Sequence, residues 1–337
     1  MIAAVRDYMS EAWDAWTEFW FAPSSPTTLS AIRVLAGAML LYTHLVWSMG
    51  LTQFFGNDGW LPITLHQQMI DGPADPNSPT PPEKHVSAMW THFNYVNSPK
   101  LIWTIHITAL TVFFLLAVGL FSRVMAILAF LFAVSYANRI TPGAYFGLDK
   151  INCMLAMYLM VGPCGARYSI DRLWRLRRGS NDVPASSFAN LAIRLIQVHM
   201  CIIYFFSGLA KAGGFPWAVG EATWLSWDLA EYRSFDMTWM VSHQLLMNFM
   251  THVTVFWELS YCALVWPALT RPWVLMMAIL VHLGIALTLG MPTFGLVMLI
   301  GNLAFVSPKI VRKVFDPFAR RLSLAVVGKA TKAGAGE

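Results

Sequence analysis

The chain has 337 residues, of which 57% are hydrophobic and 12% are charged, and its mean hydropathy is +0.53. Soluble globular domains carry about 25% charged residues, so this composition excludes that class and indicates an integral membrane protein. The net charge of +5 therefore predicts no nucleic-acid partner, because the basic residues of a membrane protein are distributed over its loops.

Residues 1–27 are predicted to form an amphipathic helix that lies in the membrane interface. Its acidic residues recur at steps of four, three and four and share one helix face: Asp7, Glu11, Asp14 and Glu18. The opposite face carries Met9, Trp13, Trp16 and Trp20. An ordinary packed helix remains the alternative, because interfacial helices are usually basic.

The apolar runs between Thr28 and Ser307 predict an all-α fold, a polytopic bundle of about eight transmembrane helices. A span needs about 17–25 mostly apolar residues to cross a hydrocarbon core about 30 Å thick. Five runs meet that length, near residues 28–48, 101–121, 190–209, 250–268 and 272–290. Three shorter runs are expected to be helices inside the bundle, near residues 123–138, 147–162 and 293–307.

The basic residues of the connecting segments predict the orientation, because cytoplasmic loops carry the excess of positive charge. With eight spans and the N-terminus inside, fifteen lysine and arginine residues lie on cytoplasmic segments and five on the other side. Both termini are therefore expected in the cytoplasm, with residues 308–337 as a basic tail. The long loops 49–100 and 210–249 then lie outside, and the stretch DGPADPNSPTPPEK at 71–84 is predicted to be irregular.

Neither a metal centre nor a disulfide framework is predicted. The four cysteines form no C-x-x-C pair and are Cys153, Cys164, Cys201 and Cys262. His85 and His92 are seven residues apart, but no third ligand follows at the spacing of a metal site.

Ionisable residues inside the predicted spans are functional candidates, because placing them in lipid is costly. Arg194 is expected to reach the cytoplasmic headgroups, whereas for the deeper Arg33 both this reach and a buried partner such as Glu258 stay open. Asp149 is expected to cap its helix. Glu258 lies several residues from either end of its span, so its carboxylate must be protonated, paired or hydrated. His282 is expected to bind a backbone carbonyl.

Lys211 ends the apolar run YFFSGLA and precedes AGGFPW. A cation at a helix C-terminus that reaches the headgroups is the simpler explanation. Two features favour a functional role: the glycines and the proline allow the backbone to turn back sharply, and several tryptophans keep the segment near the membrane. Those tryptophans are Trp217, Trp224, Trp227 and Trp239. Aromatic cover penalises the charged form of an amine, which predicts that Lys211 acts as a base.

Four stretches together resemble the HTTM family and the membrane module of vitamin K-dependent γ-carboxylases. They are YFFSGLAK through PWAVGEA, TPGAYFGLDKINCMLAMYLMVGPCGARYSID, FWELSYCALVWPALTRPW, and HLGIALTLGMPTFGLVML. The similarity runs from about Thr28 to Ser307. It implies an HTTM-like membrane domain over residues 28–307 in a multi-pass protein of the cell membrane, with the bacterial inner membrane as the expected location.

The resemblance also implies a carboxylase-like activity that uses a reduced quinone of the vitamin K type. Lys211 would be the base that deprotonates the quinone, and Glu258 and His282 would be polar members of the same cavity. The expected cofactor contacts are Tyr204, Gly208 and Trp217. The expected partners are the lipid bilayer, a quinone or lipid ligand, and a peptide substrate on the extracytoplasmic side.

Two other functions remain open. The first is a non-enzymatic accessory or immunity-like membrane protein, similar to the sporulation-delaying members of the same family. The second is a small transporter in which Glu258 and His282 are the coupling groups. No internal two-fold repeat of apolar segments is evident in the sequence, which disfavours a transporter.

Overall fold

The computed structural model describes residues 2–71, 90–96, 98–139, 141, 143–180, 182–232 and 234–319. These described residues are helical and contain no strand beyond one isolated backbone bridge between Ser24 and Ser186. The described residues do not include the prolines of 72–84, His85, or residues 320–337 of the expected tail. The all-α class predicted from the sequence is confirmed.

Eight helices of the described residues form the bundle, and each coincides with one predicted span. They are α2 (Thr27–Trp47), α5 (Pro99–Val118), α6 (Ser122–Ala137), α7 (Gly147–Val161), α9 (Ser187–Ala212), α12 (Gln244–Leu264), α13 (Arg271–Thr288) and α14 (Pro292–Asn302). Four helical segments are long and apolar enough to cross a membrane: Thr27–Phe55, Pro99–Val118, Ser187–Ala212 and Arg271–Thr288. Helices of transmembrane length are therefore confirmed, whereas eight crossings and the orientation of the termini stay predictions.

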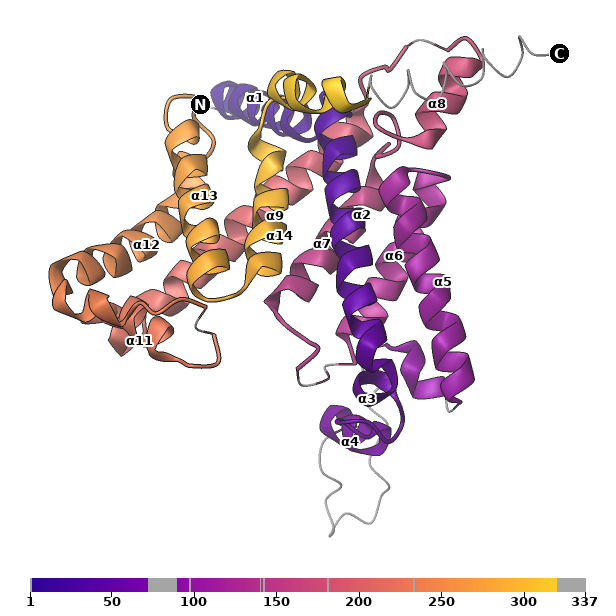
Figure 1. Cartoon of the computed structure of the whole chain (residues 1–337). Coiled ribbons are helices and arrows are strands. Elements are labelled where there is room, and N and C mark those ends of the chain that lie inside the picture. Colours follow the sequence, from indigo (N-terminus) through magenta and orange to yellow (C-terminus); the bar gives the residue numbers. More distant parts are fainter. Residues whose placement is uncertain are drawn as a thin grey trace.

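The bundle has two groups of four helices (Figure 1). One group contains α2, α5, α6 and α7, and the other contains α9, α12, α13 and α14. Contacts of α7 with α9 and α14, and of α2 with α14, join the two groups. The active-site candidates Lys211, Glu258 and His282 all lie in the second group.

Further helices, most of them short, cover the two ends of the bundle. At one end lie α1 (Ile2–Phe21), which crosses the bundle end, α8 (Ile170–Arg177) and a helix over residues 308–319; we call this end the α1–α8 face (Figure 1). At the other end, called the α4–α11 face, lie α3 (Leu51–Phe55), α4 (Ile63–Asp71), α10 (Phe215–Ala218) and α11 (Ala222–Asp228). The predicted outer loops therefore contain helices that are too short to be recognised as apolar runs.

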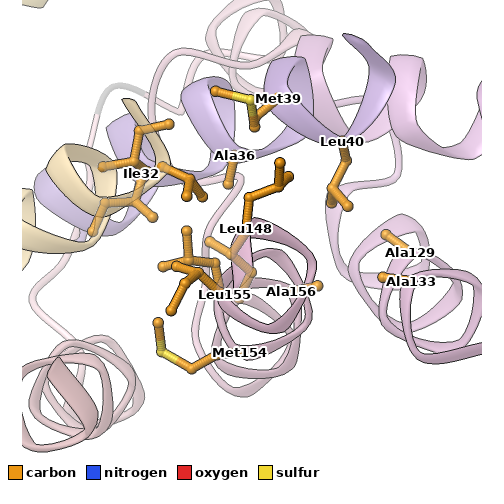
Figure 2. Close-up of a cluster of buried hydrophobic side chains, with 14 of the residues drawn as sticks. Ile32, Ala36, Met39, Leu40, Ala129, Ala133, Leu148, Met154, Leu155 and Ala156 are labelled. Atoms are coloured by element: carbon orange, nitrogen blue, oxygen red, sulfur yellow. The ribbon is translucent and has the colours of Figure 1, made fainter. Parts of the chain in front are cut away.

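The core between α2, α6 and α7 combines large aliphatic side chains with alanines (Figure 2). The aliphatic residues include Ile32 and Leu40 of α2 and Leu155 of α7, and Ala129 and Ala133 line the facing side of α6. Small residues at helix contacts allow the backbones of membrane helices to approach closely. The core is therefore held by packing between helices rather than by burial from water alone.

A tight turn joins α5 to α6 at Gly119. Its φ of +74° belongs to the left-handed region, which glycine adopts without strain. A Cβ at this position would lie 2.4 Å from the Cβ of Ser169 and 2.7 Å from Nη1 of Arg33. The start of α6 is held by Asp171, whose carboxylate accepts from the backbone N–H groups of Phe121 and Ser122 at 2.8 Å each.

Arg33 binds this turn from α2, and neither of the two alternatives left open for it applies. The side chain is fully buried, so it does not reach the headgroups, and it does not pair with Glu258. Its guanidinium donates to four backbone carbonyls, those of Leu116, Ala117, Cys164 and Tyr168. Free carbonyls at a helix end and in a loop replace the carboxylate partner, because a guanidinium offers five donors.

The end of α1 is fastened to the start of α9. Arg194 donates from Nε to the carbonyl of Phe19 at 3.1 Å and stacks on the Phe19 ring at 4.3 Å. The amide of Asn190 donates to the carbonyls of Phe19 and Trp20 at 2.8 and 3.0 Å. Arg194 therefore binds another helix rather than the headgroups, contrary to its expected role.

Asp149 acts as the expected cap of α7. Its Oδ2 accepts from the backbone N–H of Phe146 at 2.8 Å, which satisfies a donor at the helix start.

Candidate functional site

The amine of Lys211 and the carboxylate of Glu258 form a bidentate contact between α9 and α12. Nζ of Lys211 donates to Oε2 of Glu258 at 2.8 Å and to Oε1 at 3.0 Å. It also donates to the hydroxyl of Ser207, one turn earlier on α9. The side chains of Lys211 and Glu258 are 24% and 9% exposed. The amine is thus held against a nearly buried carboxylate instead of pointing into bulk solvent.

Gly208 allows α9 and α12 to meet beside this pair. A Cβ at Gly208 would lie 3.0 Å from both the Cβ of Glu258 and the backbone nitrogen of Leu259. These distances are shorter than ordinary carbon contacts of about 3.5–4.0 Å, so a larger residue forces the helices apart. The structure therefore places Gly208 at a helix–helix contact, where it sets the position of Glu258.

The chain turns back after Lys211, as the glycines and the proline predict. Helix α9 ends at Ala212, and α10 begins at Phe215 with Pro216 in its first turn. This turn brings the ring of Trp217 to 5.4 Å from Nζ of Lys211, within the range of a cation–π contact. Trp217 therefore contributes an aromatic face beside the amine, in addition to the contact of the amine with Glu258.

A second polar cluster lies about two turns earlier on α9, at Tyr204. The hydroxyl of Tyr204 is 2.6 Å from Nε2 of His282 and accepts from Nδ2 of Asn302 at 2.9 Å. The hydroxyl of Tyr261 donates to Oδ1 of Asn302 at 2.7 Å. All four side chains are buried. The expected backbone partner of His282 is wrong, because the hydroxyl of Tyr204 binds this imidazole instead.

This cluster fixes where the hydrogens lie. Nδ2 of Asn302 also donates to the carbonyl of Met298 at 2.9 Å, so this atom is the amide nitrogen. Among the described residues the hydroxyl of Tyr204 has no acceptor other than Nε2 of His282, so its own hydrogen goes to that atom. The neutral imidazole therefore carries its hydrogen on Nδ1, which has no partner among the described residues.

Four members of the two clusters escaped the sequence analysis: Ser207, Trp257, Tyr261 and Asn302. The ring of Trp257 lies 4.9 Å from that of Tyr204 and 6.4 Å from that of His282, so it packs against the second cluster. Asn302 had a detectable signal, because it interrupts the apolar stretch LIGNLAF within a predicted span. A search restricted to ionisable residues does not find an amide.

No three His, Cys, Asp or Glu side chains in the described part of the chain are placed to hold a metal ion. The four cysteines are free thiols and form no disulfide. The polar chemistry of the site therefore comes from the amine, the carboxylate, the imidazole and two phenols.

A profile of the HTTM domain matches residues 82–309, more than half of the chain. No curated protein and no solved structure matches the chain significantly. The matched region contains both polar clusters and seven complete helices of the bundle, which are α5, α6, α7, α9, α12, α13 and α14. The chain therefore belongs to the HTTM domain family, as the four sequence stretches predict.

Proposed function

We propose that this HTTM chain is a multi-pass protein of the bacterial cell membrane whose Lys211–Glu258 pair removes a proton from a lipid-soluble hydroxyl compound. The expected compound is a reduced quinone of the vitamin K type. The contact of Nζ with both carboxylate oxygens, at 2.8 and 3.0 Å, supports this proposal most strongly. This contact places a proton acceptor beside a cation, in a bundle that contains helices of transmembrane length.

The pair has a definite role in the proton transfer. The O–H bond of the substrate breaks, its electron pair stays on oxygen, and the pair gains one proton. If the pair starts as ammonium and carboxylate, the proton goes to Glu258; if it starts as amine and carboxylic acid, the proton goes to Lys211. Both routes leave an ammonium beside the new oxyanion, and an apolar setting strengthens that attraction.

The residues around the pair fit a flat aromatic substrate. The indole of Trp217 offers a face next to Nζ, at 5.4 Å from ring centroid to nitrogen. Tyr204 and Asn302 hold His282 in one tautomer, whose Nδ1–H is buried and has no partner among the described residues. Gly208 keeps Glu258 in place. A reduced quinone, when bound, supplies the acidic hydroxyl and the ring that stacks.

The distribution of charge supports the orientation that this function requires. Basic residues are concentrated on the α1–α8 face, where α8 alone contributes Arg172, Arg175 and Arg177. Placing this face in the cytoplasm follows the positive-inside rule. Eight crossings then put both termini inside and Lys211 near the outer leaflet, on the side where a peptide substrate is expected.

Turnover of vitamin K hydroquinone by protein in nanodiscs tests the proposal. Lys211→Ala and Glu258→Gln are expected to abolish quinone epoxide formation, followed by chromatography under air with a glutamate peptide and bicarbonate. Lys150→Ala is the matched control, because this lysine is exposed at the start of α7. Turnover by Lys211→Ala at the wild-type rate, or none by the folded wild-type protein, would contradict the proposal.

The accessory function is the second candidate, because the Lys211–Glu258 contact also fastens α9 to α12. An accessory role needs only the fold. It predicts that a folded Lys211→Met, Glu258→Gln double variant retains full function in cells.

A further inference from the structure

Helix α8 is docked against the turn between α5 and α6, at the α1–α8 face (Figure 1). The backbone N–H of Asp171 donates to the carbonyl of Gly119 at 3.0 Å. The hydroxyl of Ser122 donates to Oδ2 of Asp171 at 2.7 Å. The first turn of α8 is therefore fixed to the start of α6, and this attachment sets where the rest of α8 lies.

Three side chains of α8 and its C-terminal end line a surface hollow of about 260 Å³. They are Trp174, Arg177 and Arg178, and their spacing of three and four residues makes them neighbours on one helix face. Trp174 is 42% exposed, and both arginines are exposed. Pockets that enclose drug-sized molecules have about 300–1,000 Å³. This hollow is smaller and lies at the surface, so it suits a compact group such as a lipid headgroup.

The positive charge of this hollow has no carboxylate partner in the part of the chain that the structure describes. Residues 167–178 contain five arginines and one aspartate. The carboxylate of that aspartate, Asp171, accepts from two backbone N–H groups at the start of α6. The ion pairs of the described residues include neither Arg177 nor Arg178. Both guanidiniums are therefore available to an anion from outside the chain.

The hollow lies at the edge of an apolar surface. The ring of Trp174 is 5.9 Å from that of Phe121, which is 58% exposed and directly precedes α6. From there an exposed apolar stripe runs along one face of α6 through Val124, Ile127 and Leu131. Tryptophan rings collect at the level of the lipid headgroups. Trp174 therefore marks the place where the apolar stripe ends and the headgroup region begins.

We infer that this hollow binds the headgroup of an anionic phospholipid, with Arg177 and Arg178 donating to its phosphodiester and its acyl chains lying along the apolar stripe of α6. A guanidinium suits a phosphate because its planar fork donates two hydrogen bonds at once. Two cations without a carboxylate disfavour a zwitterionic headgroup, whose choline group is itself positive. A soluble phosphate compound has no chains for the stripe. The site shares no residue with the Lys211–Glu258 pair and does not depend on the proposed function.

Two phospholipids with the same acyl chains and different headgroups test the inference. The full chain is purified in detergent and mixed with equimolar palmitoyl-oleoyl phosphatidylglycerol and phosphatidylcholine, and native mass spectrometry measures the lipid retained. The wild-type protein is expected to retain more phosphatidylglycerol. The double variant Arg177→Gln, Arg178→Gln is expected to lower the ratio of the two lipids at least fivefold. Each basic residue near an anionic surface contributes about 1 kcal/mol, which is a factor of about five.

A second pair of basic residues at the same end of the bundle separates this site from a general attraction to positive charge. Lys309→Gln, Lys313→Gln removes two charges from exposed positions that do not line the hollow, and it is expected to leave the ratio unchanged. Unchanged thermal unfolding shows that both double variants fold. Three results would overturn the inference: equal retention of the two lipids by the wild-type protein, an equal loss of preference in both double variants, or displacement of phosphatidylglycerol by equimolar glycerol phosphate.

Discussion

The hydroxyl of Tyr204 on α9 lies 2.6 Å from Nε2 of His282 on α13, although 78 residues separate them in the chain. Asn302 of α14 donates to the same hydroxyl, so one phenol joins three helices. This phenol therefore decides which imidazole nitrogen of His282 carries the hydrogen.

Tyr204→Phe is expected to destabilise the protein by about 1–3 kcal/mol, because Asn302 and His282 each lose a partner in a buried site. Nitrogen NMR of labelled histidine should show a changed tautomer for His282. Tyr158→Phe is the control, since Tyr158 also binds a histidine, His199, at 2.9 Å but is only half-buried. An equal loss of thermal stability in both variants would contradict the stabilising role of the buried hydrogen bonds that Tyr204 makes.

Breaking the Lys211–Glu258 pair on one side is expected to cost more than removing both charges. Lys211→Met or Glu258→Gln leaves the partner uncompensated, and breaking a buried pair costs about 3–5 kcal/mol. We expect about 1–3 kcal/mol here, because Lys211 is 24% exposed and water screens its charge. Thermal unfolding of the two single variants and the double variant gives the coupling energy. Additive losses would show that the pair contributes no coupling.

Gly208→Ala is expected to destabilise the bundle by about 1–3 kcal/mol, because an added methyl group overpacks the α9–α12 contact. Gly284→Ala provides the control within α13, where an added Cβ meets nothing within 4 Å. There the substitution is expected to be neutral or to stabilise the helix by up to about 1 kcal/mol. The same change in melting temperature for both variants would refute a close contact at Gly208.

Arg33→Met is expected to cost at least about 3 kcal/mol, since four backbone carbonyls lose a charged donor inside the protein. Arg33→Lys should recover little, because an ammonium cannot reproduce the planar fork of a guanidinium. Folded yield and thermal unfolding in detergent measure both variants. Arg123→Met, at an exposed position in α6, should behave like the wild-type protein.

Apolar runs were sufficient to locate all eight bundle helices, because a helix in a bilayer must be apolar along most of its length. The partners of Arg33 escaped prediction for a physical reason. They are backbone carbonyls, which every residue carries, at a turn 83 to 135 residues away. No side-chain pattern marks such an acceptor. The helices α3 and α4 were missed because they contain only five and nine residues, too few for a periodic signal.

The candidate site was predicted in part. Lys211 and Glu258 were each selected from the sequence, and the structure brings them together, but their pairing depends on the close contact of α9 and α12 at Gly208 and cannot be read from spacing. His282 was selected with the wrong partner. Asn302 was passed over because it carries no charge, although amides are as difficult as hydroxyls to leave unpaired in lipid.

Helix α14 has 11 residues, a length of about 17 Å that covers little more than half of a hydrocarbon core of about 30 Å. The 3-10 turn that follows it, Leu303–Phe305, is bound from α9, because Gln197 donates to the carbonyl of Ala304 at 2.8 Å. A segment of this length is a poor substrate for insertion by itself. The packing of α14 against α9 is therefore what brings Asn302 to Tyr204, so the position of this short helix and the buried cluster depend on the same helix contact.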